Sequence, residues 1–161
     1  MAVGTQIDLT GVTFGEAYVG YRAQHYDDRR LDPITGLTMG ARLTTNVTPL
    51  TTVQLLVDRE IEETNLFAAE GFWATSVRAS LDHELLRNLI LSGGLGYSWY
   101  DYQGVDREDN SFRATLAANY LMSRYLTIGL AYDFEWRGSQ GAAAGIDYTA
   151  NRVLLKMTAH P

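Results

Sequence analysis

The sequence has no cysteine among its 161 residues and contains only 3 prolines. Without cysteine there can be no disulfide bond and no thiolate metal site. No run of about 18 or more apolar residues occurs, which excludes a transmembrane helix. Lysine and arginine number 13 against 19 acidic residues, and no basic patch alternates with aromatics, so nucleic-acid binding is not expected. What is abundant, 15 glycines and 10 tyrosines, is typical of a chain rich in β-sheet.

The N-terminal sequence lacks both the basic region and the apolar region of a signal peptide. If the protein is exported, either a signal peptide has been removed or the sequence is a piece of a longer exported chain. The length predicts one domain over residues 1–161. Within it, residues 1–11 alternate only weakly, and we expect them to form an N-terminal extension or a partial strand.

The segment Tyr125–Arg137 has the clearest pattern in the chain. Every second residue is apolar, while the residues between are small or charged, which predicts a β-strand with two unlike faces. A soluble β-sandwich would bury the apolar face in its core. A membrane barrel would turn the apolar face to lipid and the polar face to its lumen. The apolar residues are Leu126, Ile128, Leu130, Tyr132, Phe134 and Trp136.

Eight such segments follow one another, and the connections between them are alternately long and short. This sorting is expected of a membrane barrel, whose periplasmic turns are short and whose external loops are long. The sequence therefore predicts an all-β fold, an eight-stranded antiparallel up-and-down transmembrane β-barrel with both termini on the short-turn side. A soluble sandwich or a lipocalin-like barrel is the alternative. The segments are residues 13–26, 37–47, 51–61, 72–82, 89–100, 111–122, 125–137 and 146–159.

The two faces predict two groups of residues. Aromatic residues near the long-loop ends of the apolar face predict an interfacial girdle: Tyr21, Trp73, Tyr97, Trp99, Tyr132, Phe134 and Trp136. Charged residues of both signs on the opposite face predict a lumenal network: Glu16, Arg22, Arg42, Asp58, Glu60, Arg78, Asp82, Arg113, Asp133, Glu135, Arg137, Arg152 and Lys156.

The lumenal charges have two interpretations. In an eight-stranded barrel the interior is just wide enough for side chains to fill, so the charges would pair and plug the lumen. Four arginines, at positions 42, 78, 113 and 152, would then pair with carboxylates. In a wider barrel the same residues would line a water-filled channel. Unpaired charges in a narrow lumen are costly, so the mixture of signs favours the plug.

Evidence for catalysis or metal binding is weak. His25 lies beside two aspartates in a long loop, but no serine completes a convincing triad, and His83 sits near a short turn, where capping or solvation is expected. Carboxylates cluster in the long loops, and residues 106–110 lack the spacing and glycine of an EF-hand. We expect a hydrated external surface there. Weak divalent-ion bridging to lipopolysaccharide is the more specific hypothesis.

Several stretches resemble the C-terminal eight strands of the bacterial "putative outer membrane β-barrel" family, some of whose members are associated with exopolysaccharide export. The resemblance covers nearly the whole chain, and it implies a fold and not a reaction. Members are longer, and their last strand usually ends in an aromatic residue that the assembly machinery reads, whereas this chain ends in His160-Pro161. The matching stretches are residues 9–22, 46–52, 82–89, 120–126 and 147–153.

Together these observations predict a non-enzymatic outer-membrane barrel with a plugged lumen and a structural or scaffolding role. The first alternative is a pore or export-channel segment of a larger barrel for solutes or polysaccharide, and the second is a rim enzyme or ligand-binding barrel. The expected partners are the lipid bilayer, lipopolysaccharide and the barrel assembly machinery. No cofactor and no metal are expected.

Overall fold

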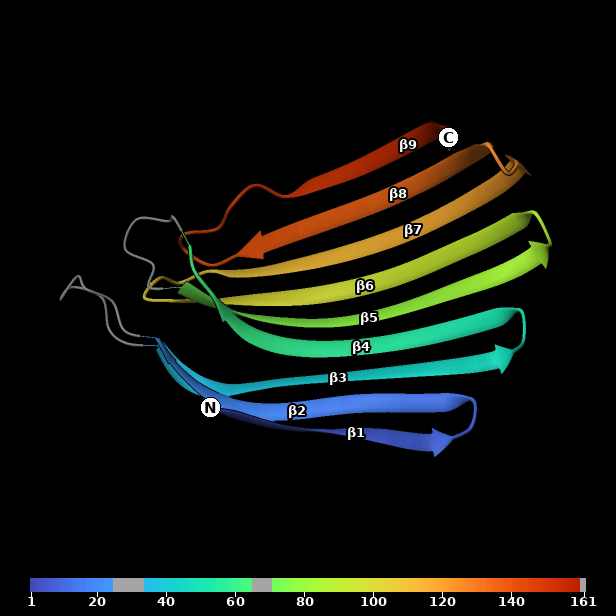
Figure 1. Ribbon diagram of the computed structural model, residues 1–161. Coiled ribbons are helices and arrows are strands. Elements are labelled where there is room, and N and C mark those ends of the chain that lie inside the picture. Colours follow the sequence, from blue (N-terminus) through green and yellow to red (C-terminus); the bar gives the residue numbers. More distant parts are fainter. Residues whose placement is uncertain (25–33, 65–70, 160–161) are drawn as a thin grey trace.

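The computed structural model describes residues 1–24, 34–64 and 71–159, and these form one antiparallel sheet (Figure 1). The strands lie side by side in the order in which they occur in the chain, and each pairs with the next. The prediction of an all-β, antiparallel, up-and-down sheet is therefore confirmed. The strands are β1 (Ala2–Thr10), β2 (Thr13–Gln24), β3 (Ile34–Thr48), β4 (Thr51–Glu62), β5 (Gly71–Leu86), β6 (Leu89–Gln103), β7 (Glu108–Ser123), β8 (Leu126–Gln140) and β9 (Tyr148–Ala159).

The described residues form nine strands, where the sequence predicted eight. The additional strand is β1, which a tight turn at Gly11 and Val12 folds back onto β2, with Thr5 opposite Ala17. The amino group of Met1 donates a hydrogen bond of 2.9 Å to the carbonyl oxygen of Tyr21. The N-terminal end of β1 thus lies at the long-loop end of the sheet, so the expectation that both termini share the short-turn side is wrong.

The sheet is open within the part of the chain that the structure describes. Strands β1 and β9 are its two edges, and neither is paired with the other (Figure 1). The closed barrel predicted from the sequence is therefore not formed in this structure.

Short turns and longer connections lie at opposite ends of the sheet, as the sequence predicted (Figure 1). The turns between β3 and β4, β5 and β6, and β7 and β8 contain two residues each. The predicted long loop 101–110 is shorter, because β6 continues to Gln103 and β7 already begins at Glu108. Two other long connections run through residues 25–33 and 65–70, which lie outside the described residues.

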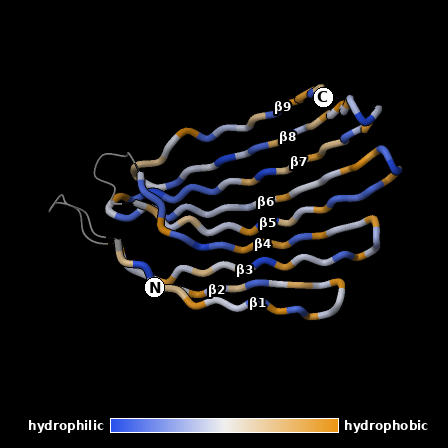
Figure 2. The backbone as a smooth tube through the Cα atoms, in the orientation of Figure 1, coloured by the Kyte–Doolittle hydropathy of each residue, from blue (hydrophilic) through white to orange (hydrophobic). Residues whose placement is uncertain are grey.

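Strict alternation gives the sheet an apolar face and a polar face, and Figure 2 shows hydrophobic and hydrophilic residues following one another along the strands. Side chains on the apolar face remain exposed: Leu116 is 64% exposed and Val153 is 73% exposed. A surface of this kind needs a cover of lipid or of another apolar surface. Among the described residues no helix has the length and apolar character needed to cross a membrane.

The buried core is small and lies at the long-loop end. Trp73 is 8% exposed and packs with Ile34 and Ile61. A Cβ atom at Gly36 would lie 2.5 Å from Cζ2 of this indole, so the absence of a side chain there makes room for the ring. Arg59 stacks over the same indole, with its guanidinium carbon 4.6 Å from the ring centroid. The described residues therefore lack an interior core of the size that a soluble domain of this length would need.

Candidate functional site

Three arginines stand in one row across the polar face of the sheet. Cross-strand pairing runs from Arg42 on β3 through Leu56 to Arg78 on β5, and on through Gly96 to Arg113 on β7. Residues paired in this way share one face of a sheet, so the three side chains, hereafter the arginine row, project to the same side. They are separated by two strand spacings, or about 10 Å. Glutamates 16 and 135 stand at the two ends of this row.

Each arginine of the row forms an ion pair. Arg42 pairs with Glu16 at 3.2 Å, Arg78 with Asp58 at 2.7 Å, and Arg113 with Glu135 at 2.8 Å. On β9, Arg152 also reaches Glu135, at 3.7 Å. The structure thus brings together the four arginines and three of the carboxylates for which the sequence predicted pairing.

The guanidinium groups lie closer to solvent than most of their partners. The side chain of Arg113 is 59% exposed and that of Glu135 only 14%, while Arg78 is 57% exposed and Asp58 26%. Each arginine uses one terminal nitrogen for its carboxylate, and a guanidinium carries five N–H donors. Exposed ion pairs of this kind contribute little to stability, about 0–1 kcal/mol each, so stability alone does not account for the arginine row.

A second row, of serines, runs beside the arginine row. Ser76, Ser98 and Ser111 oppose one another on β5, β6 and β7, and we call them the serine row. Asp58 and Arg137 stand at its two ends. Asp58 accepts hydrogen bonds from the hydroxyl of Ser76 at 2.8 Å and from Arg78, which joins the two rows.

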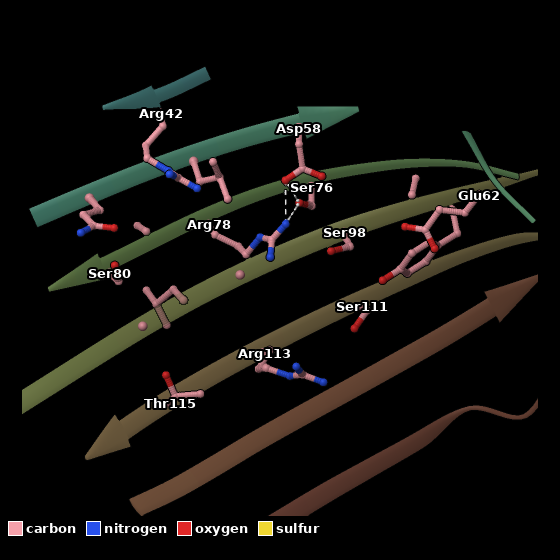
Figure 3. Close-up of a pocket in the computed structure, with 18 residues that line it drawn as sticks. Arg42, Asp58, Glu62, Ser76, Arg78, Ser80, Ser98, Ser111, Arg113 and Thr115 are labelled. Carbon is pink, nitrogen blue, oxygen red and sulfur yellow. Dashed lines mark hydrogen bonds and ion pairs between the residues drawn. The ribbon is translucent and has the colours of Figure 1, made fainter. Parts of the chain in front are cut away.

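Both rows line a groove of about 510 Å³ on the polar face (Figure 3). Its floor is low because β6 contributes Gly94 and Gly96 between the side chains of β5 and β7. In Figure 3, Arg78 and Arg113 lie on either side of this gap, while Glu62 lies toward the far end of the groove. The groove is thus bordered by two cations and a line of hydroxyl groups.

A separate charged cluster closes the long-loop end of β7. The carboxylate of Asp109 is fully buried and accepts hydrogen bonds from Arg107, Arg137 and Ser139. Arg107 pairs with it at 2.8 Å, and hydrogen bonding to Asp109 raises the pKa of Arg107 above the ordinary arginine value. The expectation of a hydrated acidic loop is wrong for Asp109, which lies in this cluster with both arginines.

Next to this cluster, two connections are joined by hydrogen bonds. The backbone amide of Ala142 donates to the carboxylate of Asp106 at 3.0 Å, and that of Ala143 to its carbonyl oxygen at 3.0 Å. Asp147 in turn accepts from the backbone amide of Ser139 at 2.7 Å. The connection between β6 and β7 is therefore fastened to the connection between β8 and β9.

The other predicted lumenal residues are spread along the polar face. Glu60 accepts a hydrogen bond of 2.9 Å from the hydroxyl of Tyr18, and Asp82 accepts one of 2.6 Å from Ser92. Within the described part of the chain, Asp133 and Lys156 have no hydrogen-bond or ion-pair partner, although both lie on the polar face beside Arg152 and Gly129 respectively. Arg22 lies opposite Gly36 near the long-loop end. The predicted network is thus several local groups and not one continuous chain.

Most of the predicted aromatic girdle lies together on the apolar face. Tyr97 packs against Trp99 with ring centroids 4.6 Å apart, and the row that contains Tyr97 continues through Phe112 to Trp136. The other members, Tyr21, Tyr132 and Phe134, share this face by register, and Trp73 is the buried residue described above. Whether these rings contact a membrane interface stays a prediction.

Among the described residues, the candidates for catalysis and metal binding do not come together in a site. His83 lies on the apolar face of β5, where its Nδ1 is 2.9 Å from the hydroxyl oxygen of Thr51. His25 lies outside the described residues. No group of three or more His, Asp or Glu side chains within the described ranges could hold a metal ion.

Sequence reasoning missed the serine row and the glycine floor. Both are small residues that alternate with apolar ones, so they look like ordinary strand positions until register places them side by side. It also missed Asp109, whose partners Arg137 and Ser139 are about thirty residues away in the chain. The available signal was that Asp109 continues the alternation of Ser111 and Arg113, which places it on the polar face of a longer β7.

The fold and this site define a class: an antiparallel sheet with one exposed apolar face and one charged, grooved face, as in the wall of a β-barrel membrane protein. The comparison with protein families agrees. Residues 1–160 match the family described as "Putative beta-barrel porin 2", and the chain belongs to that family. Membership implies a porin-like role and an outer-membrane location, and it favours a non-enzymatic function. No curated protein and no solved structure matches the chain.

Proposed function

We propose that the chain forms part of the wall of a water-filled outer-membrane pore that passes polar solutes. The observation that carries this proposal is that each arginine of the row pairs with a carboxylate on a neighbouring strand, beside a groove of about 510 Å³ on the polar face. These pairs need no partner from an opposite wall, so a lumen wide enough for water would leave them intact. The apolar face would meet lipid over strands of 12 to 16 residues from β2 onward, more than the roughly 9–11 residues that a tilted strand needs.

The open edges support a barrel wider than the eight strands expected. Unpaired backbone groups in lipid cost several kcal/mol each, so the free edges of β1 and β9 need partners in a membrane. The two edge strands run in the same direction, because an even number of antiparallel steps separates them. Direct closure would therefore need a parallel seam, whereas one further strand, or any odd number, restores antiparallel pairing throughout.

A plugged barrel with a scaffolding role is the second candidate. The ion pairs of the arginine row favour it, since they would fill a narrow lumen if β2 and β9 closed an eight-stranded barrel and β1 were displaced. The extension of the sheet to β1 opposes this candidate, because β1 occupies the edge of β2 with a regular register from Ala2 to Asp8.

Conductance in a planar bilayer tests the first candidate against the second. The protein is refolded in detergent, a gel confirms the folded form, and single-channel current is recorded in potassium chloride. Uniform, long-lived steps are expected of a pore wall. Silence from folded protein, together with a mass of one chain in its detergent complex, would favour the plug and refute the pore.

Cross-linking identifies what meets the edges. The chain has no cysteine, so a pair placed in Thr5→Cys and Asn151→Cys, on the apolar sides of β1 and β9, gives an unambiguous readout. A short dimaleimide tolerates an unknown register. A cross-link within one chain would indicate nine-stranded closure with a parallel seam. A product of two chains would indicate that a second copy completes the wall.

A further inference from the structure

The groove between Arg78 and Arg113 has the features of a binding site, and not only of a pore wall. The two arginines stand two strands apart, and the residue directly between them on β6 is Gly96, with Gly94 next to it on the same face. A Cβ atom at Gly96 would lie 3.3 Å from Cγ of Arg78. The stem of Arg78 therefore lies close to Gly96, and a larger residue there would crowd Arg78 and enter the groove that both arginines line.

Both arginines keep N–H donors that form no hydrogen bond to another described residue. Arg78 donates through Nη2 to Asp58 and to Ser76, and Arg113 donates through Nη2 to Glu135. The Nε and Nη1 groups of both arginines have no partner among the described residues. A guanidinium fork matches the two oxygens of a carboxylate, so a ligand carboxylate could be held without displacing the protein's own ion pairs.

The serine row supplies the second recognition element. Ser98 and Ser111 form no hydrogen bond to another side chain within the described ranges, and both line the groove one step from the arginine row. Hydroxyl groups both donate and accept hydrogen bonds, so they match the hydroxyl groups of a solute. On the opposite side of the arginine row, Ser80 and Thr115 continue the polar lining.

We propose that this groove, the Arg78–Arg113 cradle, binds small hydroxylated carboxylates in the lumen of the pore. The carboxylate lies between the two arginines and is attracted by both positive charges, and the hydroxyl groups contact the serine row. The inference rests on the proposed function for its physiological meaning, because solute would reach the cradle through the pore. Binding itself is a property of the folded sheet, so it can be measured whether or not the protein conducts.

Equilibrium titration of sodium gluconate into the folded protein in detergent tests the cradle. Glucose, which has hydroxyl groups but no charge, and propionate, which has charge but no hydroxyl groups, are the matched probes. Gluconate is expected to bind at least about tenfold more tightly than either, since both recognition elements are then used. Equal affinities for gluconate and propionate would overturn the role of the serine row, and no binding of gluconate would overturn the proposal.

Variants assign the binding to this groove. Arg78→Gln and Arg113→Gln are each expected to weaken gluconate binding about tenfold, as loss of a charge-assisted contact implies. Gly96→Val keeps both charges but fills the gap, and it is expected to abolish binding. Arg124→Gln, in the turn between β7 and β8, is the control and should leave the affinity unchanged. A wild-type affinity in folded Gly96→Val protein would refute the cradle even if an arginine variant failed to fold.

Single-channel recording separates this inference from the proposed function. If the protein conducts and gluconate binds, gluconate is expected to reduce the current of the wild type but not of Gly96→Val. If it conducts and gluconate does not bind, the cradle fails and the pore stands. If gluconate binds to a folded protein that never conducts, the pore fails and the cradle stands as a ligand site.

Discussion

Removal of the Asp109 carboxylate is expected to be among the most destabilising single changes in this sheet. The side chain is fully buried, and its two arginine partners are 12% and 31% exposed. Loss of one partner from a buried ion pair costs roughly 3–5 kcal/mol, because the charge left behind is uncompensated. Arg137 can turn partly to water, so we expect Asp109→Ala to lower the free energy of unfolding by about 3 kcal/mol.

Urea titration of the folded protein in detergent micelles, followed by tryptophan fluorescence, measures this loss. Asp133→Ala is the matched control, since Asp133 lies on the neighbouring strand without a hydrogen-bond or ion-pair partner among the described residues, and a change within about 0.5 kcal/mol is expected. Equal losses in the two variants would refute the view that Asp109 holds the long-loop end together. A further check is proteolysis of the connection 141–147, in which the amide of Gly145 donates to the hydroxyl of Ser139 in the cluster and which Asp109→Ala should make more accessible.

Two further predictions concern the tryptophans. Gly36→Val places a side chain where the Trp73 indole now lies, 2.5 Å from the nearest ring atom, and should cost about 1–3 kcal/mol by urea titration, whereas Gly11→Ala, with nothing within 4 Å, should be neutral. Equal effects would contradict the packing of Trp73. In bilayers with brominated lipids, single-tryptophan proteins that retain Trp99 or Trp136, which are 44% and 38% exposed, should be quenched strongly, and one that retains Trp73 only weakly. Equal quenching of all three would contradict a lipid-facing girdle on the apolar face.

Much of the sheet could be predicted from alternation alone, because period two assigns each residue to a face without knowledge of its neighbours. The segment Tyr125–Arg137 illustrates this, since all of its charged residues lie on the polar face of β8. Alternation fails at β1, whose pattern is weak, although the turn at Gly11 and its regular pairing with β2 make it a full strand. A short strand at an edge needs tertiary pairing to be recognised.

The candidate site was only partly predictable, because partners depend on register. Composition was enough to expect that the arginines would pair with carboxylates. It could not indicate that Arg113 pairs directly across the strand with Glu135, while Arg78 pairs diagonally with Asp58. The gap over Gly96 is a further case, since its significance comes from the two arginines on the strands to either side of it.

The width of the barrel links the ion pairs to the choice between a plug and a pore. Barrel diameter grows roughly linearly with strand number, and at about eight strands the side chains fill the interior. Each arginine of the row pairs with a carboxylate on a neighbouring strand, and none of these pairs needs a partner from an opposite wall. Adding strands would therefore separate the walls without breaking these contacts. A row of charges that is satisfied along its own wall is suited to a lumen that contains water.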